Sequence, residues 1–220
     1  MVFPLGDDNS ARRSLPVVTF GLIALNVAFF LVELNGGDAF IRQWAFIPAR
    51  FGQNPAGDAH TILTAMFMHG GWLHLGGNML YLWIFGDNVE DEFGPIKFLI
   101  FYLVCGAGAT FAQYLMFPGS RIPNVGASGA IAGVLGGYLL LFPQARVRVL
   151  FGGRIVEMPA LFVLGLWIAL QVFSGVGSIA ATAQTEETGG VAYMAHVGGF
   201  AAGFLLTFLL RARSGASRAG

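Results

Sequence analysis

The sequence predicts an all-α integral membrane protein, a bundle of six transmembrane helices with both termini in the cytoplasm. Three observations lead to this fold class. Of the 220 residues, 55% are hydrophobic and only 11% are charged, and the mean hydropathy is +0.68, which is more apolar surface than one soluble core hides. Apolar windows recur at lengths near the roughly 20 residues that a helix needs to cross hydrocarbon. The basic residues segregate to one side of these windows.

Six apolar windows are the predicted spans. The second, WLHLGGNMLYLWIFG, is the least apolar because it contains His74, Asn78 and two glycines. The connection of about residues 35–71 contains Trp44 and other aromatic residues, so we expect a partly structured loop in the outer membrane interface. The six windows are residues 17–34, 72–86, 96–116, 127–143, 158–175 and 192–210.

A single membrane domain of residues 16–213 is the simplest partition. It follows a cytoplasmic tail of residues 1–15 and precedes a Gly-, Ser- and Arg-rich tail of residues 214–220 that we expect to be disordered. No small-residue cleavage pattern follows the first apolar run, which predicts an uncleaved signal anchor.

The orientation follows from the basic residues, because Lys and Arg favour cytoplasmic loops. With the N-terminus inside, nine of them are cytoplasmic and three are outside. The cytoplasmic set is Arg12, Arg13, Lys97, Arg146, Arg148, Arg154, Arg211, Arg213 and Arg218, and the outer set is Arg42, Arg50 and Arg121. We therefore expect a multi-pass protein of the cell (inner or plasma) membrane with an even number of spans. The zero net charge and the lack of a basic cluster give no indication of nucleic-acid binding.

Unusual polar residues lie at the outer ends of three spans. Spans two, four and six all run from outside to inside, and they begin with His74 and Asn78, with Ser128, and with His196. An ionisable residue within a span is by default a functional candidate. Three separate segments therefore converge on one depth, just beneath the outer face.

Ser128 and His196 have the chemistry of a nucleophile and its base. Ser128 stands in GASG at a helix start, where glycines permit a tight backbone and free N–H groups face an approaching group. A free hydroxyl is a weak nucleophile and needs a base. His196 is the only histidine of the sixth span.

Glycines predict how the two spans meet. Gly129, Gly133 and Gly137 recur every four residues on the fourth span, and Gly199 and Gly203 form a similar pair on the sixth. Such small-residue ridges let helices approach closely in lipid. If the ridges face each other, Ser128 and His196 reach a similar depth.

We expect a Ser–His dyad, since the acidic residues considered lie in loops or at helix ends; these are Glu33, Asp38, Asp58, Glu186 and Glu187. Acyl transfer also needs donors for a developing oxyanion. His74 and Asn78 are four residues apart and share one helical face. These two side chains and the Ser128 backbone N–H are the predicted donors.

The motifs HGGWLHLGGN, GASG and AHVGGFAAG, in this order, resemble those of the rhomboid intramembrane serine proteases, over most of residues 17–211. The resemblance implies that Ser128 is the nucleophile, His196 the general base, and His74 and Asn78 the oxyanion donors. It also implies that His69 orders the loop before the second span and that Gly199 and Gly203 are close-packing glycines.

The resemblance further implies the substrates: transmembrane proteins, cut near the outer membrane surface, often after a small residue, and admitted between spans two and five. Two features depart from the family pattern. Ala132 stands where some members have an aromatic residue that stacks on the catalytic histidine, and Arg42 and Trp44 are two residues apart where some members have an adjacent Trp–Arg pair.

Other interpretations of the same residues stay open. Ser128 alone could be a helix N-cap, His196 an interhelical hydrogen-bond partner, and His74 with Asn78 a polar contact between helices. A catalytically silent rhomboid-like pseudoprotease would bind membrane proteins without cutting them. A proton-linked transporter is disfavoured because we find neither an intramembrane carboxylate nor a repeated half. No metal or cofactor is expected, and the single Cys105 excludes an internal disulfide.

Overall fold

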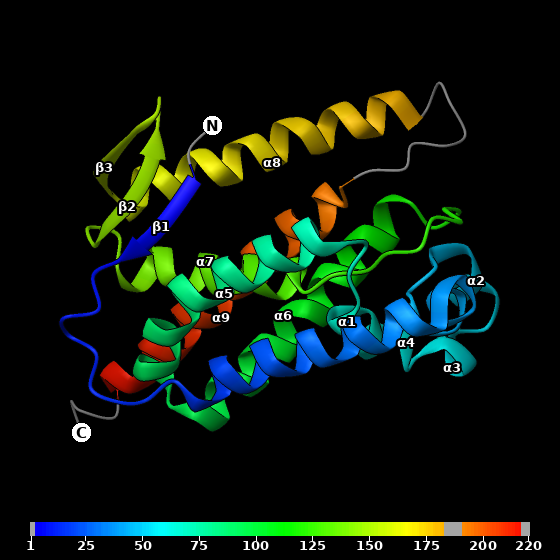
Figure 1. The fold of residues 1–220 in the computed structure, drawn as a ribbon, viewed down its shortest axis with the longest axis horizontal. Coiled ribbons are helices and arrows are strands. Elements are labelled where there is room, and N and C mark those ends of the chain that lie inside the picture. The colour runs from blue at the N-terminus through cyan, green and yellow to red at the C-terminus, as the bar shows by residue number, and fades with distance from the viewer. Residues whose placement is uncertain (1–2, 183–190, 217–220) are drawn as a thin grey trace.

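The structure, a computed structural model, describes residues 3–182 and 191–216. Six long helices dominate this part of the chain (Figure 1). They are α1 (Val17–Trp44), α5 (Trp72–Phe93), α6 (Pro95–Met116), α7 (Ser128–Leu141), α8 (Ala160–Thr182) and α9 (Tyr193–Ala216). Each of them overlaps one of the six predicted windows. The last runs to Ala216, into the segment expected to be disordered, while residues 217–220 lie outside the described residues.

Four of these helices are long and apolar enough to cross a membrane: α1, α6, residues 160–179 of α8 and residues 193–211 of α9. The other two differ for physical reasons. Helix α7 has only 14 residues, fewer than a bilayer core requires. Helix α5 ends in the acidic stretch DNVEDEF. The count of six spans therefore remains a prediction.

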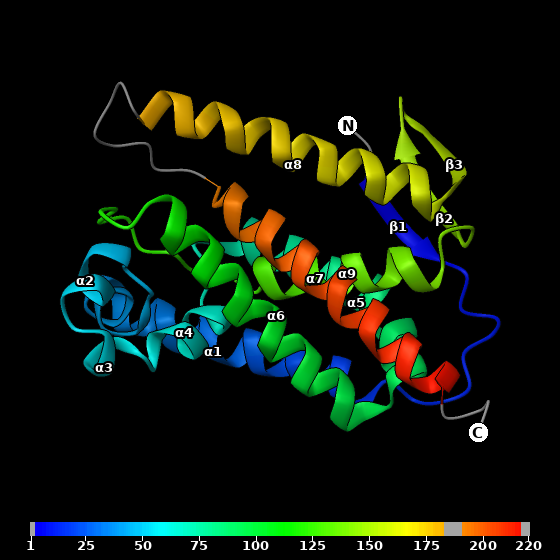
Figure 2. The same ribbon diagram turned by 180° about the vertical axis from the view of Figure 1, so that it is seen from behind.

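The connection between α1 and α5 is partly helical, as the sequence predicted. Helix α1 continues past the first window, interrupted by the non-helical Gly37 (φ 57°). The chain then folds into short helices that lie together at one end of the bundle (Figures 1 and 2). They are α2 (Pro48–Gln53), α3 (Pro55–Asp58), α4 (Thr61–Thr64) and the 3-10 helix η1 (Ala65–Phe67).

A small antiparallel sheet corrects the all-α prediction. Its strands, in the order β1-β2-β3, are Phe3–Asp7, Arg146–Phe151 and Arg154–Pro159. Strands β2 and β3 form a hairpin whose turn residues, Gly152 and Gly153, both have positive φ, as the two-residue turn of a hairpin requires. The alternating RVRVLF and the GG pair after it are typical of a β-hairpin. The hairpin strands are too short and too polar to form an apolar window.

The N-terminal segment, expected as a tail, is docked on the helices. Strand β1 pairs with β2, and the Asp7 carboxylate accepts hydrogen bonds from Tyr138 Oη and Asn88 Nδ2, each at 2.7 Å. Arg12 forms an ion pair with the buried Asp87, with 2.6 Å between Nη1 and Oδ2. Strand β1 and the end of α9 lie at the same end of the bundle, opposite α2–α4 (Figures 1 and 2).

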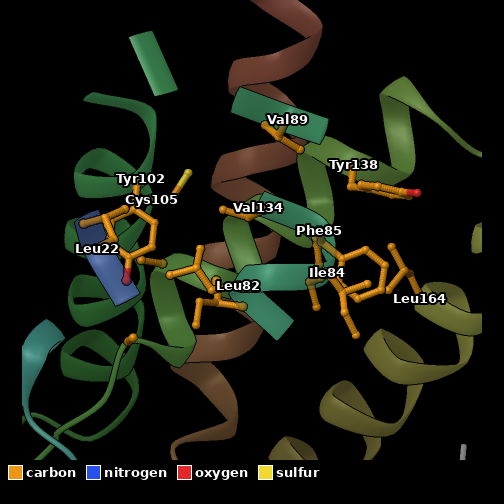
Figure 3. Packing of buried hydrophobic residues seen from close by; sticks show 14 of the residues in the cluster. Leu22, Leu82, Ile84, Phe85, Val89, Tyr102, Cys105, Val134, Tyr138 and Leu164 are labelled. Atoms are coloured by element: carbon orange, nitrogen blue, oxygen red, sulfur yellow. The ribbon is translucent and has the colours of Figure 1, made fainter. Parts of the chain in front are cut away.

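The core surrounds α7, which is buried from Gly129 through Tyr138. Side chains from α1, α5, α6, α7 and α8 meet in one apolar cluster, in which Phe85, Val134 and Leu164 are fully buried (Figure 3). On its other side α7 packs directly on α9. A Cβ on Gly199 would overlap the carbonyl oxygen of Gly129, and one on Gly203 would overlap that of Gly133. Small residues of α7 and α9 therefore lie directly against each other in the structure.

Candidate active site

The loop before α7 is anchored on both sides, and this positions Ser128 at the helix start. Phe46 and Asn124 form an isolated antiparallel bridge, and the Gly126 N–H donates to the Ala65 carbonyl at 2.9 Å. Gly126 has a φ of 131°, which side chains other than glycine rarely allow. The half-buried Ser128 then begins α7, where the first N–H groups of the helix have no intrahelical partner.

His196 reaches Ser128 from the neighbouring helix. Its Nε2 lies 2.8 Å from Ser128 Oγ, within hydrogen-bond range. The imidazole is 9% exposed. His196 precedes Gly199 by three residues, slightly less than one helical turn. The contact of Gly199 with Gly129 brings the two backbones together. The glycine contacts thus place the hydroxyl and the imidazole at one depth.

A third side chain, which the sequence reasoning missed, completes a chain of hydrogen bonds. Gln171 on α8 places its Oε1 at 2.7 Å from His196 Nδ1. The sequence pattern offered a weak signal, because Gln171 is a polar residue within an otherwise apolar span. The sequence predicts a Ser–His dyad, and in the structure the carboxamide of Gln171 lies beside that pair.

An aromatic ring contacts His196 although Ala132 supplies none. The rings of Trp167 and His196 have centroids 5.8 Å apart and planes inclined at 34°. Trp167 lies one helical turn before Gln171, so both side chains leave α8 on the same face. The aromatic contact thus comes from α8 and not from α7.

Of the two predicted oxyanion donors, His74 lies beside the same loop, and Asn78 is buried within α5. Asn78 is 8% exposed, and its Nδ2 has no hydrogen-bond partner among the described residues. The Gly70 N–H donates to His74 Nδ1 at 3.3 Å, which leaves Nε2 as the protonated nitrogen of a neutral ring. A Cβ on Gly126 would lie 3.0 Å from His74 Nε2 and 3.5 Å from Ser128 Oγ. His74 Nε2 and Ser128 Oγ therefore both lie close to the position that a Cβ on Gly126 would occupy.

His69 contacts the His74 ring and is held in place by Glu33. Its backbone N–H donates to the buried Glu33 carboxylate at 2.9 Å, and its ring meets the His74 ring edge to face at 5.3 Å. Burial, and then the neighbouring His74, lowers the pKa of His69 to about 4, so the ring is neutral at physiological pH. Glu33 was expected in a loop or at a helix end, but it lies buried within α1, a candidate span. This corrects the expectation that no span holds a carboxylate, and the contact with His69 shows that Glu33 orders the loop.

A small pocket opens beside Ser128, with a volume of about 20 Å³, enough for one water or a methyl-sized group. Its polar lining residues besides Ser128 are Thr110 and Asn124. Small residues form most of the rest, among them Ala65, Gly106, Ala109, Gly126, Gly129 and Ala130. Among the residues that the structure describes, no three His, Cys, Asp or Glu side chains are placed to share a metal ion.

The chain is similar to known proteins over most of its length. Residues 56–213 match the family model of the rhomboid domain. The chain is 31% identical to the rhomboid protease GluP of Bacillus subtilis over 195 residues, which is 88% of the chain and 34% of that protein. It is 31% identical to the mitochondrial rhomboid protein 1 of Saccharomyces cerevisiae over 197 residues, 86% of the chain and 51% of that protein.

A plant relative, RHOMBOID-like protein 4 of Arabidopsis thaliana, is 36% identical over 152 residues, 69% of the chain and 34% of that protein. The chain thus spans between a third and a half of the length of these relatives. With its apolar helices and this match over most of its length, the chain is a multi-pass membrane protein that belongs to the rhomboid family.

Proposed function

We propose that the chain is an intramembrane serine endopeptidase that cleaves transmembrane proteins near the outer face of the membrane through an acyl-enzyme. The observation that carries the proposal is the 2.8 Å contact between His196 Nε2 and Ser128 Oγ. It joins a hydroxyl at a helix start to an imidazole whose other nitrogen is already hydrogen-bonded, the arrangement of an activated nucleophile.

In the first half of the reaction the Ser128 oxygen attacks the peptide carbonyl while its proton passes to His196 Nε2. The carbonyl oxygen takes up the negative charge and accepts hydrogen bonds from the His74 Nε2–H, the Asn78 Nδ2–H and backbone N–H groups of the first turn of α7. His196 then gives the proton to the departing amine, the C–N bond breaks, and the acyl group stays on Ser128.

In the second half a water molecule gives its proton to His196 Nε2 and adds to the ester carbonyl. The ester bond breaks, His196 returns the proton to Ser128 Oγ, and the new carboxyl end leaves. The small pocket beside Ser128 has room for such a water. No step requires a cofactor or a metal ion.

Helix α8 is the proposed gate for the substrate. It packs mainly on α9 along one edge of the bundle (Figures 1 and 2), and its Phe162 and Phe173 are 62% and 79% exposed. A transmembrane substrate enters from the lipid between α5 and α8. Cross-linking α5 to α8 should therefore block cleavage, and undiminished cleavage by the cross-linked protein would contradict this path.

The decisive experiment reconstitutes the purified protein in lipid with candidate single-span substrates. Cleavage is expected for the wild-type protein and not for Ser128→Ala or His196→Ala, both of which should insert and fold normally. A fluorophosphonate should label the wild-type protein at Ser128 only. A protein that binds the substrates but neither cuts them nor reacts with the fluorophosphonate would be a pseudoprotease, and cleavage by Ser128→Ala would show that another residue is the nucleophile.

The cell membrane is the proposed location. It follows from the predicted orientation, in which the end of the bundle that holds β1 and the end of α9 faces the cytoplasm. Mitochondrial and chloroplast proteins are among the relatives, so fractionation of cells that express the natural protein is the direct measurement.

A further inference from the structure

Gln171 shares a hydrogen bond with the nitrogen of His196 that faces away from Ser128. The side-chain oxygen and His196 Nδ1 are 2.7 Å apart. An amide oxygen only accepts hydrogen bonds, so Nδ1 carries the proton and Nε2 keeps its lone pair. Nε2 in turn lies 2.8 Å from Ser128 Oγ. In this tautomer His196 is ready to take the serine proton.

We propose that Gln171 is a positioning residue for His196, the third member of a Ser–His–Gln arrangement, and that α8 must lie against α9 for the base to be oriented. The inference rests on the proposed protease function. It extends that function by assigning to the gate helix a role in the chemistry itself.

A carboxamide suits this position better than a carboxylate. A buried carboxylate would carry the cost of removing a charge from water, and that cost is high within a membrane. A carboxamide orients the ring without a permanent charge, as the Asn of Cys-His-Asn proteases does. When Nε2 takes up the serine proton the ring becomes cationic, and the Nδ1–H bond to Gln171 becomes a stronger, charge-assisted one.

Both contacts that α8 makes with His196 depend on how helix α8 lies against α9. Gln171 forms a hydrogen bond with Nδ1 of the ring, and the Trp167 ring, one turn earlier on α8, is in a tilted contact with it at a centroid distance of 5.8 Å. The half-buried Gln171 lies between strongly exposed neighbours such as Leu170, at 53%. A displacement of α8 that admits a substrate removes both contacts at once. The base is therefore oriented only after α8 has returned.

The test compares Gln171→Met, which keeps the length of the side chain but has no strong acceptor, with Gln171→Glu, which keeps an oxygen acceptor. Leu170→Met is the matched control, because it places the same new side chain at the neighbouring exposed position. We expect Gln171→Met to lower kcat by about 10- to 100-fold with little change in KM, the loss typical of one hydrogen bond to a charged group. Gln171→Glu keeps the acceptor but introduces an acidic group, so it should be more active than Gln171→Met and less active than wild type. Leu170→Met should equal wild type.

Labelling by a small fluorophosphonate separates positioning from gating, because this reagent does not need to enter between helices. If Gln171 orients the base, Gln171→Met should slow labelling of Ser128 about as much as it slows proteolysis. If Gln171→Met labels at the wild-type rate while proteolysis falls, the residue serves substrate access and the positioning role is refuted. Equal rates of both reactions in Gln171→Met and wild type would also refute it.

A structural readout does not depend on activity. In protein labelled with ¹⁵N at histidine, the ring-nitrogen shifts report which nitrogen of His196 bears the proton. We expect Nδ1–H in the wild type and a mixture of tautomers in Gln171→Met; an unchanged tautomer would contradict the proposal. Absence of labelling and cleavage in the wild type would instead refute the proposed protease function, so the two failures can be told apart.

Discussion

Substitution of Gly199 by alanine tests whether the close approach of α7 and α9 sets the distance between Ser128 and His196. The new Cβ would overlap the Gly129 carbonyl oxygen. That atom belongs to a helix backbone, so no side-chain rotation relieves the clash and the helices have to separate by about 1 Å to reach normal contact. A separation of that size stretches the 2.8 Å contact between Nε2 and Oγ beyond hydrogen-bond range.

The expected effects follow from this displacement. A misplacement of about 1 Å in a catalytic pair costs on the order of 10²-fold in rate, and overpacking costs about 1–3 kcal/mol of stability. We therefore expect Gly199→Ala to lose about two orders of magnitude in kcat and to melt at a lower temperature. The measurements are cleavage of a single-span substrate in lipid and thermal unfolding in the same detergent or lipid.

Gly21→Ala is the matched control, because Gly21, like Gly199, lies in a helix. Unlike Gly199 it is exposed, and a Cβ there meets no atom within 4 Å. It should keep full activity and gain up to about 1 kcal/mol from the better helix propensity of alanine. If Gly199→Ala matched this control in rate and melting temperature, the glycine contact would not be what sets the distance between Ser128 and His196.

Three further predictions concern the oxyanion side, the loop and the N-terminal strand. Asn78→Ala should lower kcat by about 10²- to 10³-fold while fluorophosphonate labelling of Ser128 stays detectable; a wild-type rate would remove Asn78 from the site. Gly126→Ala should strain a backbone at φ 131° and press on His74, so activity should fall more than thermal stability does, and an equal loss of both would indicate general unfolding. Burial raises the pKa of the Asp7 carboxyl to about 7, so the bound proton stabilises the docked strand fully below about pH 4, and this stabilisation is lost as the pH rises to about 7. Hydrogen exchange of the β1 amides, corrected for intrinsic rates, should show that loss in the wild type and not in Asp7→Asn, and parallel profiles would refute it.

Chemical composition and residue order already determine much of this protein. Apolar windows locate the starts of the six long helices to within two residues, because the need to hide backbone polar groups in lipid leaves little choice but a helix. The ends are less well located, since α1, α5, α8 and α9 run six to ten residues past their windows. The same order places the serine, the histidines and Asn78 near helix starts, and the spacing of Gly199 and Gly203 predicts a close helix contact. These are local properties, and the sequence carries them directly.

Only the tertiary structure showed what surrounds the imidazole. Helix α8 is apolar on nearly every face, so its hydrophobic pattern does not reveal which side turns toward α9, and with that side unknown the partners Gln171 and Trp167 could not be assigned. The docking of β1 on β2 is likewise decided in space, because it joins segments more than 100 residues apart through backbone hydrogen bonds that carry little side-chain signature. Rotation of one helix about its axis and the pairing of distant strands are set by packing of the whole chain, and local patterns do not encode them.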